Sequence, residues 1–459
     1  MQRKQIIHIK FIFLLLSLFL KDKCKVTKFA THKIFYILDK EIVKIIFQKI
    51  YKGRVMKTSK RGQMMPSSPI RKLTPYADAA KAKGIEVFHL NIGQPDIETP
   101  KIMWDTIKNF DKPVLEYGPS QGFLSLREAV CEYFKNYKID LKPNEICITI
   151  GGSEAIMFAI DSICDPEDEI IVFEPFYANY DGYALSANVK LVPVTLRAED
   201  GFHIKDFGQI EQKISPKTKA ILIGSPNNPT GTILKEEEVR KIHEIAKKFD
   251  LYIISDEVYK EFNFTDYPHF SVLQLDDPER VIVIDSVSKR FSACGARIGT
   301  LITKNQEVMS IVNKFAMARL CPPTIEQVAA EAAYKLPFSY YQTIVDEYQK
   351  RRDICYNLLT QVDGIVLQKP EGAFYLVVKL PIKNSELFAK WMLSDFEKNK
   401  KTTMVAPASG FYKTPTAGHD EVRIAYVLKE ERLKEALMVF IEGLLTYQKI
   451  EDKLLKSLV

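Results

Sequence analysis

Hydrophobic residues in the second half of the chain fall into short continuous runs, at residues 220–225, 251–255, 280–285 and 298–303. Between the first two runs, residues 235–250 are rich in Glu and Lys, as on an exposed helix. Upstream, Gly151 opens a helical stretch at 155–163, and residues 170–174 form another apolar run. Continuous apolar strands separated by helices are typical of a parallel sheet that helices cover on both faces. The pattern therefore predicts an α/β fold with a mostly parallel, doubly wound sheet.

The pattern changes after about residue 335. Residues 339–359 predict one long charged helix, and the apolar runs 365–368 and 373–380 predict strands of a smaller α+β unit. We expect residues 57–100 to form an N-terminal arm and part of a small domain. Residues 101–335 would form a large domain, and residues 336–450 the rest of the small domain.

Residues 1–56 differ from the rest of the chain, because they contain none of its 23 prolines and only one glycine. Residues 11–20 form an apolar run behind a basic start, as in a signal peptide. This run is too short to span a membrane, which takes about 20 residues, and no small-residue cleavage site follows it. The composition favours Met56 as the native start, with 1–56 an atypical extension outside the native protein. Whether this extension is expressed or acts in targeting stays open.

Composition and charge narrow the class of protein. The 459 residues are 46% hydrophobic and 27% charged, which is typical of a globular protein. The net charge of +7 arises in residues 1–56, where 13 Lys and Arg face 3 Asp and Glu, and the rest is mildly acidic. We therefore expect no nucleic-acid or membrane partner. Seven scattered cysteines without a C-x-x-C pair favour a reducing, cytoplasmic location, and the scattered histidines predict no metal site.

Four short motifs lie at the ends of predicted elements, where ligands bind in open α/β sheets. Ser286-Val-Ser-Lys289, with Arg297 downstream, matches the S-x-x-K of serine β-lactamases, but the S-D-N and K-T-G motifs of those enzymes are absent. The other three are Gly151-Gly-Ser-Glu-Ala, Ser225-Pro-Asn-Asn-Pro-Thr-Gly and Ser255-Asp-Glu-Val-Tyr. In order and spacing, the set resembles the pyridoxal-phosphate-dependent aminotransferases of fold type I (class I/II, aspartate aminotransferase-like), over about residues 60–445.

The resemblance implies pyridoxal 5′-phosphate as cofactor and gives each motif residue a role. Lys289 would form the Schiff base and move the substrate Cα proton. Asp256 would keep the pyridine nitrogen protonated, while Asn228 and Tyr259 would hydrogen-bond the phenolic oxygen. Tyr177 would stack on the ring.

The same resemblance implies a phosphate site at the start of the predicted helix, where N–H groups and the helix dipole favour an anion. Its ligands would be backbone groups of Gly152, Ser153 and Glu154 and the side chains of Ser286, Ser288 and Arg297.

The substrate site would lie beside the cofactor. Arg423 would bind the substrate α-carboxylate, with Asn228 and the backbone of Gly93 beside it, because a strand arginine is costly to bury unless an anion meets it. Tyr117 matches a tyrosine that reaches the phosphate of the neighbouring subunit in relatives. The implied assembly is a homodimer with shared active sites.

The implied activity is ping-pong transfer of an amino group between an L-amino acid and a 2-oxo acid, with aspartate and 2-oxoglutarate as the default pair. The preferred amino acid and the pathway stay open, because Ser153 stands where some aspartate-specific relatives carry Lys, and Ala296 where many carry an aromatic. Arg319 could instead meet a distal carboxylate, or it could be a solvated surface residue.

Two other classes of protein share this fold. A carbon–sulfur β-lyase or an amino acid decarboxylase would use the same lysine. A regulator that fuses the fold to a helix-turn-helix would need an upstream module, and residues 1–56 are too short and too biased in composition to form one.

Overall fold

The computed structural model describes residues 58–456, and side chains up to residue 453. The chain divides into two units, residues 1–64 and 65–459, of which the first contributes only the helix α4 (Lys60–Met64). The predictions for residues 1–56 lie outside the described residues. All strands of the described residues belong to the second unit.

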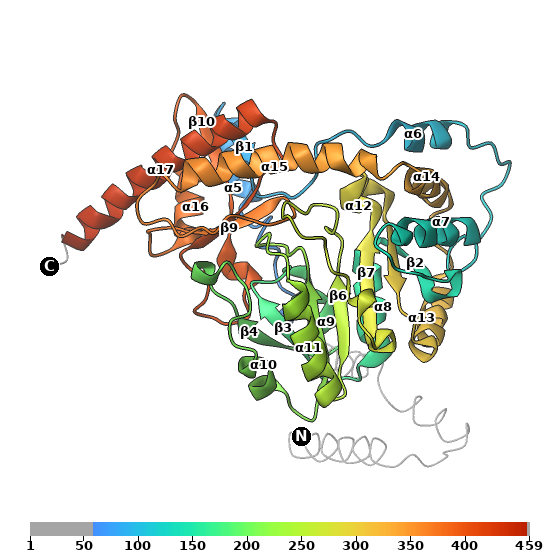
Figure 1. Cartoon of the computed structure of the whole chain (residues 1–459). Coiled ribbons are helices and arrows are strands. Elements are labelled where there is room, and N and C mark those ends of the chain that lie inside the picture. The colour runs from blue at the N-terminus through green and yellow to red at the C-terminus, as the bar shows by residue number, and fades with distance from the viewer. Residues whose placement is uncertain (1–57, 457–459) are drawn as a thin grey trace, which may run out of the picture. The chain divides into compact units, whose positions relative to one another are not determined.

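A seven-stranded sheet forms the centre of this unit (Figure 1). In chain order its strands are β2 (Ile146–Ile150), β3 (Glu169–Glu174), β4 (Lys190–Thr195), β5 (Thr218–Gly224), β6 (Tyr252–Asp256), β7 (Val281–Ser286) and β8 (Ile298–Ile302). Their order across the sheet is β2-β8-β7-β6-β5-β3-β4. All pairs are parallel except the two that β8 makes with β2 and β7. The predicted α/β fold with a mostly parallel sheet is confirmed.

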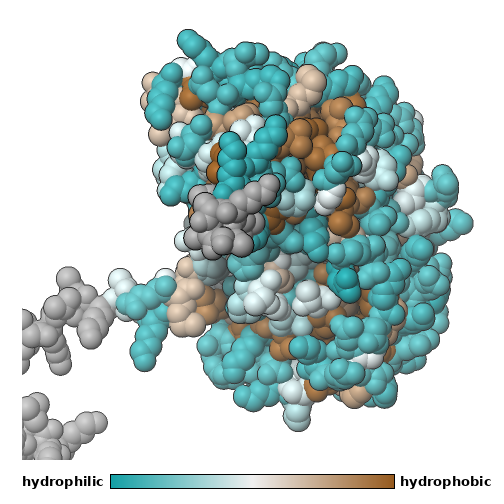
Figure 2. Space-filling model, turned by 90° about the vertical axis from the view of Figure 1, so that its left-hand side faces the viewer, coloured by the Kyte–Doolittle hydropathy of each residue, from teal (hydrophilic) through white to brown (hydrophobic). Residues whose placement is uncertain are grey.

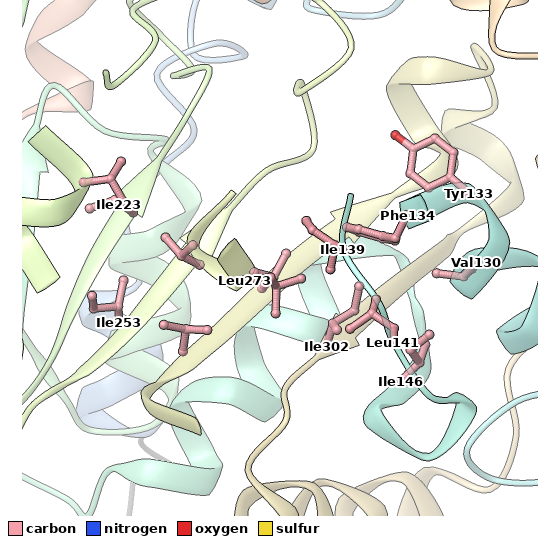
Figure 3. Packing of buried hydrophobic residues seen from close by; sticks show 14 of the residues in the cluster. Val130, Tyr133, Phe134, Ile139, Leu141, Ile146, Ile223, Ile253, Leu273 and Ile302 are labelled. Carbon is pink, nitrogen blue, oxygen red and sulfur yellow. The ribbon is translucent and has the colours of Figure 1, made fainter. Parts of the chain in front are cut away.

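Helices cover both faces of this sheet, because alternate side chains of each strand enter different cores. On β5, Ile221 and Ile223 join one cluster and Ala220 and Leu222 join the other. Part of the first cluster is shown in Figure 3. Its helices are α7 (Leu124–Lys135), α11 (Glu236–Lys248) and α14 (Thr324–Tyr334), and those of the second cluster are α8 (Gly151–Ile163), α9 (Asn179–Ser186) and α13 (Gln306–Arg319). Three shorter helices complete this region: α6 (Lys101–Lys108), α10 (Gly208–Lys213) and α12 (Val287–Arg290).

A third core joins segments from both ends of the described chain. Two small sheets lie here, β1 (Glu86–His89) paired with β10 (Lys401–Met404), and β11 (Ala406–Pro407), β12 (Glu421–Ala425) and β9 (Tyr375–Lys379) in that order. The helices are α5 (Thr74–Ala82), α15 (Ser339–Leu359), α16 (Ser385–Ser394) and α17 (Glu430–Lys456), of which α15 and α17 lie side by side (Figure 1). The expected strand at 365–368 is absent, and Val366 makes only an isolated bridge to Lys379.

The surface is mostly polar on the face shown in Figure 2, where smaller hydrophobic areas lie between hydrophilic side chains. Amphipathic helices account for this arrangement, as on α11, whose Val239 and Ile242 are buried while Glu236 and Lys247 are exposed.

A cluster of buried charges lies at the end of β7. Asp285 accepts hydrogen bonds from both Lys260 and Arg290. Arg290 Nε also lies 3.2 Å from Glu261 Oε1, and Glu261 accepts a further bond from Tyr133. The four charged side chains are almost completely excluded from solvent. Because each charge is paired, the cluster joins β7, α12, the segment after β6 and α7 without leaving an isolated ion in the core.

Replacing Asp285 with Asn removes the anion shared by two buried cations. We expect the substitution to lower the free energy of unfolding by about 3–5 kcal/mol, because Lys260 and Arg290 would remain buried without it. Chemical denaturation of the holoprotein measures this. Glu132→Gln is the matched control, because it breaks an exposed pair with Lys135 whose contribution is about 1 kcal/mol at most. Equal losses in the two variants would contradict a structural role for the cluster.

Candidate active site

One cavity of about 390 Å³ gathers twelve of the fourteen site residues proposed from the sequence. Its lining includes Gly93, Gly152, Ser153, Tyr177, Asn228, Asp256, Tyr259, Ser286, Ser288, Lys289, Arg297 and Arg423. Glu154 and Tyr117 do not line it. These residues come from segments more than 300 positions apart in the chain, so the fold itself brings them together.

The amine of Lys289 lies within this cavity. Lys289 is on α12, which starts directly after β7, and the Ser286 side chain caps that helix by accepting a bond from Ser288 N at 3.1 Å. Lys289 Nζ donates to the Gly93 carbonyl oxygen at 3.0 Å and lies 3.7 Å from Cys294 Sγ. No carboxylate forms an ion pair with it among the residues described. The amine is therefore held in place by weak neutral partners, which suits a nucleophile.

Asp256 is the last residue of β6, and its side chain faces the same cavity. Burial raises the pKa of Asp256 to about 6, although hydrogen bonds from Tyr180 and from Val258 N work in the opposite direction. The Tyr180 hydroxyl donates to Asp256 Oδ2 at 2.7 Å. A carboxylate in such surroundings gains from a cationic partner, as the protonated nitrogen of a heteroaromatic ring would be.

The hydroxyl of Tyr259 lies 2.9 Å from that of Tyr375, which in turn donates to the Gly93 carbonyl oxygen at 3.3 Å. Burial raises the pKa of Tyr259 well above its usual value, so the phenol stays protonated and keeps its capacity to donate one hydrogen bond. The approach is close, because a Cβ on Gly93 would overlap the Tyr375 hydroxyl.

The start of α8 and Arg297 meet at one corner of the cavity. Gly151 has φ of +70°, and a Cβ there would lie 2.3 Å from the Arg297 guanidinium. Strand β8 packs equally closely, because a Cβ on Gly299 would lie 2.4 Å from the Gly151 carbonyl carbon. The hydroxyls of Ser286 and Ser288 lie 2.7 Å apart at the same cavity. Helix N–H groups, hydroxyls and a guanidinium are the donors that a phosphate group requires.

Arg423 lies on β12 and is 1% exposed, yet no carboxylate among the described residues pairs with it. Its guanidinium donates to Asn228 Oδ1 at 3.1 Å and to the Asn91 carbonyl oxygen at 2.5 Å, and it stacks on Tyr375 and Phe411. Its Nε has no partner among the residues described. A buried cation with a free donor and neutral neighbours is an incomplete site that an incoming carboxylate would complete.

The expectation that Arg319 is a solvated surface residue is wrong, because its side chain is only 11% exposed. Arg319 does not line the cavity, and a contact with a distal carboxylate stays a prediction. Arg319 donates to the carbonyl oxygens of Ser120 and Ile148 at 3.1 and 3.2 Å, and its Nε lies 3.7 Å from Glu154 Oε1. Glu154 in turn accepts a bond from Ile150 N at 2.8 Å. These two side chains fasten α8 to β2, while a phosphate contact from the Glu154 backbone stays a prediction.

The family follows from comparison with known proteins. The sequence model of the family described as "Aminotransferase class I and II" matches residues 85–440. This chain belongs to that family. The aspartate aminotransferase of Pyrococcus horikoshii is 32% identical over 385 residues, covering 83% of this chain and 95% of that protein. The aromatic-amino-acid aminotransferase 2 of Thermococcus litoralis is 33% identical over 389 residues, covering 83% and 97%.

Solved structures agree with this assignment. The crystal structure of aspartate aminotransferase from Thermotoga maritima has a TM-score of 0.76 at 31% identity, and covers 83% of this aminotransferase and 98% of its own chain. The structure of alanine aminotransferase from Pyrococcus furiosus has a TM-score of 0.78 at 31% identity, with coverage of 84% and 99%. The predicted fold type I is therefore confirmed.

Class I and II aminotransferases depend on pyridoxal phosphate, so the cofactor predicted from the sequence is confirmed. The cavity of this aminotransferase fits that group by the chemistry of its donors. An amine, a buried carboxylate, two hydroxyls and a guanidinium at a helix start all face one space. Within residues 58–456, no helix is long and apolar enough to cross a membrane, and no cluster of His, Cys, Asp or Glu is arranged to hold a metal ion.

Several cavity residues of the aminotransferase were missed by the sequence analysis: Ser68, Ile70, Arg71, Tyr180, Cys294 and Tyr375. Tyr180 was available as a neighbour of Tyr177, but only the folded chain shows that it bonds Asp256. For Arg71 and Tyr375 no local pattern distinguishes a cavity residue from a surface or core residue.

A histidine between two glutamates holds the loop that carries Asn228. His203 Nδ1 lies 2.9 Å from Glu238 Oε2, and its Nε2 lies 3.2 Å from Glu371 Oε2. Glu371 also accepts from Ile233 N at 3.0 Å, just after that loop. Burial lowers the pKa of His203, but the two carboxylates outweigh burial and raise it to about 9. The pKa values of both glutamates are lowered, because their bonds to His203 outweigh the effect of burial.

This cluster predicts a pH dependence of stability. A histidine whose pKa is raised on folding stabilises the fold fully below about pH 6.5, and that contribution is lost as pH rises through about 9. The gap in unfolding free energy between wild type and His203→Gln should therefore shrink by up to about 3 kcal/mol from pH 6.5 to 9.5. Denaturation at each pH measures the gap. The exposed His419→Gln variant is the control, and an equally pH-dependent gap there would contradict the assignment.

Proposed function

We propose that this aminotransferase transfers the amino group of an L-amino acid to a 2-oxo acid by a ping-pong mechanism that uses Lys289, with aspartate and 2-oxoglutarate as the default pair. The observation that carries the proposal is the placement of a carboxylate-free amine, Lys289, and an incompletely paired arginine, Arg423, at one cavity. An amino acid offers the matching groups, an α-carboxylate and an adjacent amine. A concave cavity in which polar groups converge on one space is typical of small-molecule sites.

The cofactor, when bound, supplies an electrophilic aldehyde and an electron sink. Asp256 would hold its ring nitrogen, and Asn228 and Tyr259 its phenolic oxygen, with Tyr177 against the ring. Its phosphate would be bound by Gly152, Ser153, Glu154, Ser286, Ser288 and Arg297.

The chain's own residues then act on the substrate. Arg423 binds the α-carboxylate through its free donor and orients the Cα–H bond toward Lys289, with Asn228 and the Gly93 backbone beside it. Lys289 Nζ takes the proton from Cα of the amino acid as a general base, and in the second half of the reaction it delivers a proton to Cα of the incoming 2-oxo acid as a general acid.

The relatives of this chain differ in the amino acid substrates that their names indicate. Proteins similar to this chain carry the names aspartate, aromatic-amino-acid and alanine aminotransferase. Aspartate recurs in these names across several organisms, which supports it as the default. A carbon–sulfur β-lyase or decarboxylase would release a different product from the same cavity.

A homodimer in the cytoplasm completes the proposal. Apolar side chains are exposed on and near the segment before α7, with Tyr117 81% exposed and Val114 and Leu115 each 62% exposed. Exposed apolar residues that are neighbours in the chain mark an interaction surface. A second copy covering this surface would bring Tyr117 to the phosphate of the partner subunit. The six described cysteines are free thiols, which suits the cytoplasm.

Borohydride treatment tests the role of Lys289. The reduced holoenzyme should carry its cofactor permanently on Lys289, and peptide mapping would show this. The substitution Lys289→Ala should lower the rate of transamination by about 100- to 10,000-fold, because proton transfer at Cα is lost. The exposed Lys335→Ala is the control. A panel of single amino acids with 2-oxoglutarate then identifies the pair. An adduct on another lysine, or release of ammonia or carbon dioxide in place of a new amino acid, would overturn the proposal.

Mixed dimers test the shared site. Lys289→Ala subunits and Tyr117→Phe subunits are each expected to give weakly active homodimers at limiting cofactor. A hybrid of the two contains one site with both Lys289 and Tyr117 intact, so it should recover about half of the wild-type activity. Absence of recovery in a dimer verified by light scattering would show that Tyr117 does not serve the partner's site.

A further inference from the structure

The active-site cavity contains one cation for which neither the cofactor nor the α-carboxylate accounts. The charged residues of its lining are Arg71, Lys289, Arg297 and Arg423 on the positive side, and Asp256 alone on the negative side. Lys289 and Arg423 act at the substrate Cα and its carboxylate in the proposed function, and Arg297 lies at the phosphate corner. Arg71 has no such role.

The backbone of Arg71 is fixed next to the α-carboxylate site. The preceding residue, Ile70, offers its carbonyl oxygen to Asn91 Nδ2 at 2.8 Å, and the Asn91 carbonyl oxygen accepts from Arg423 at 2.5 Å. On the other side, Leu73 is buried in the third core, and Thr74 N donates to the Arg71 carbonyl oxygen at 2.9 Å. Arg71 is therefore connected through its neighbour Ile70 to Asn91, and through Asn91 to Arg423, the arginine that would hold the substrate.

The side chain of Arg71, by contrast, makes no ion pair and no hydrogen bond with the residues that the structure describes. The next residue differs, because Lys72 Nζ lies 2.8 Å from Glu386 Oε2. The only carboxylate of the cavity lining, Asp256, is already bonded to Tyr180. The Arg71 side chain is exposed, so water solvates its guanidinium and leaves it available to an anion in a cavity whose lining has an excess of cations.

We propose that Arg71 binds the side-chain carboxylate of dicarboxylic amino acids and 2-oxo acids, and so determines selectivity for acidic substrates. This inference rests on the proposed function. It assigns the distal-carboxylate role to a cation of the cavity lining, whereas Arg319 lies outside that lining. Arg423 and Arg71 would then hold the two ends of a substrate with two carboxylates, each able to form paired N–H···O bonds. Ile70 and Ile92, which line the same cavity, offer apolar contact to neutral side chains instead.

The test compares Arg71→Gln, Arg71→Lys and the control Lys72→Gln, which removes a neighbouring charge outside the cavity. Selectivity is the ratio of kcat/KM for aspartate and glutamate to kcat/KM for alanine and leucine. A charge-assisted bond of this kind changes that ratio by about 10- to 150-fold. We expect Arg71→Gln to lower the ratio by that factor, Arg71→Lys to retain part of it, and Lys72→Gln to leave it unchanged.

A binding measurement that needs no turnover separates selectivity from catalysis. Succinate, an unreactive dicarboxylate, should bind the Arg71→Gln holoenzyme at least about 10-fold more weakly than wild type by calorimetry, whereas the affinity for propionate should differ little. An unchanged ratio, or an equal loss for acidic and neutral substrates, would overturn the role of Arg71. If wild-type protein transaminates no amino acid at all, the proposed function itself has failed, so the two failures are distinguishable.

Discussion

The buried ion pairs of Asp285 are the interaction on which the geometry of the active site depends. Asp285 lies within four residues of Lys289 in the chain, and its two partners, Lys260 and Arg290, directly follow Tyr259 and Lys289. A single carboxylate therefore fixes the end of β7, the end of α12 and the segment after β6 relative to one another. Because separating buried charges is strongly unfavourable, these segments cannot shift independently. Lys289 is positioned by charges that do not themselves line the cavity.

The sheet explains why residues so far apart in the chain converge. Parallel strands have their carboxyl ends at one edge, and the side chains that follow β6 and β7 meet there. The other wall of the cavity comes from β9 and β12 of a second sheet, which supply Tyr375 and Arg423. The strand that carries Arg423 therefore packs in a different core from the helix that carries Lys289.

Local sequence patterns predicted the helices and strands in which hydrophobic residues recur with a clear period and whose ends coincide with a change in that pattern. The helix expected at 339–359 is α15 (Ser339–Leu359), and the motif residues reached one cavity because each motif follows a strand. Periodicity does not encode strand direction, so nothing indicated that β8 runs antiparallel. Nor does it encode partners distant in the chain. Arg319 was misjudged for that reason, since its contacts with Ser120 and Ile148 are made across more than 170 positions.

The close packing of Gly299 against Gly151 has a consequence for how this protein can diverge. A side chain at Gly151 or Gly299 would overlap its neighbours, so these two positions accept only glycine without a local shift of the structure. At the other end, the turn around Arg71 is held by backbone groups and by neighbours, and the side chain at position 71 is free of packing demands. The two ends of the cavity therefore differ in the substitutions that they accept: the glycine positions at one end cannot gain a side chain without a local shift, whereas the exposed position 71 at the other end accepts side chains of different size and charge.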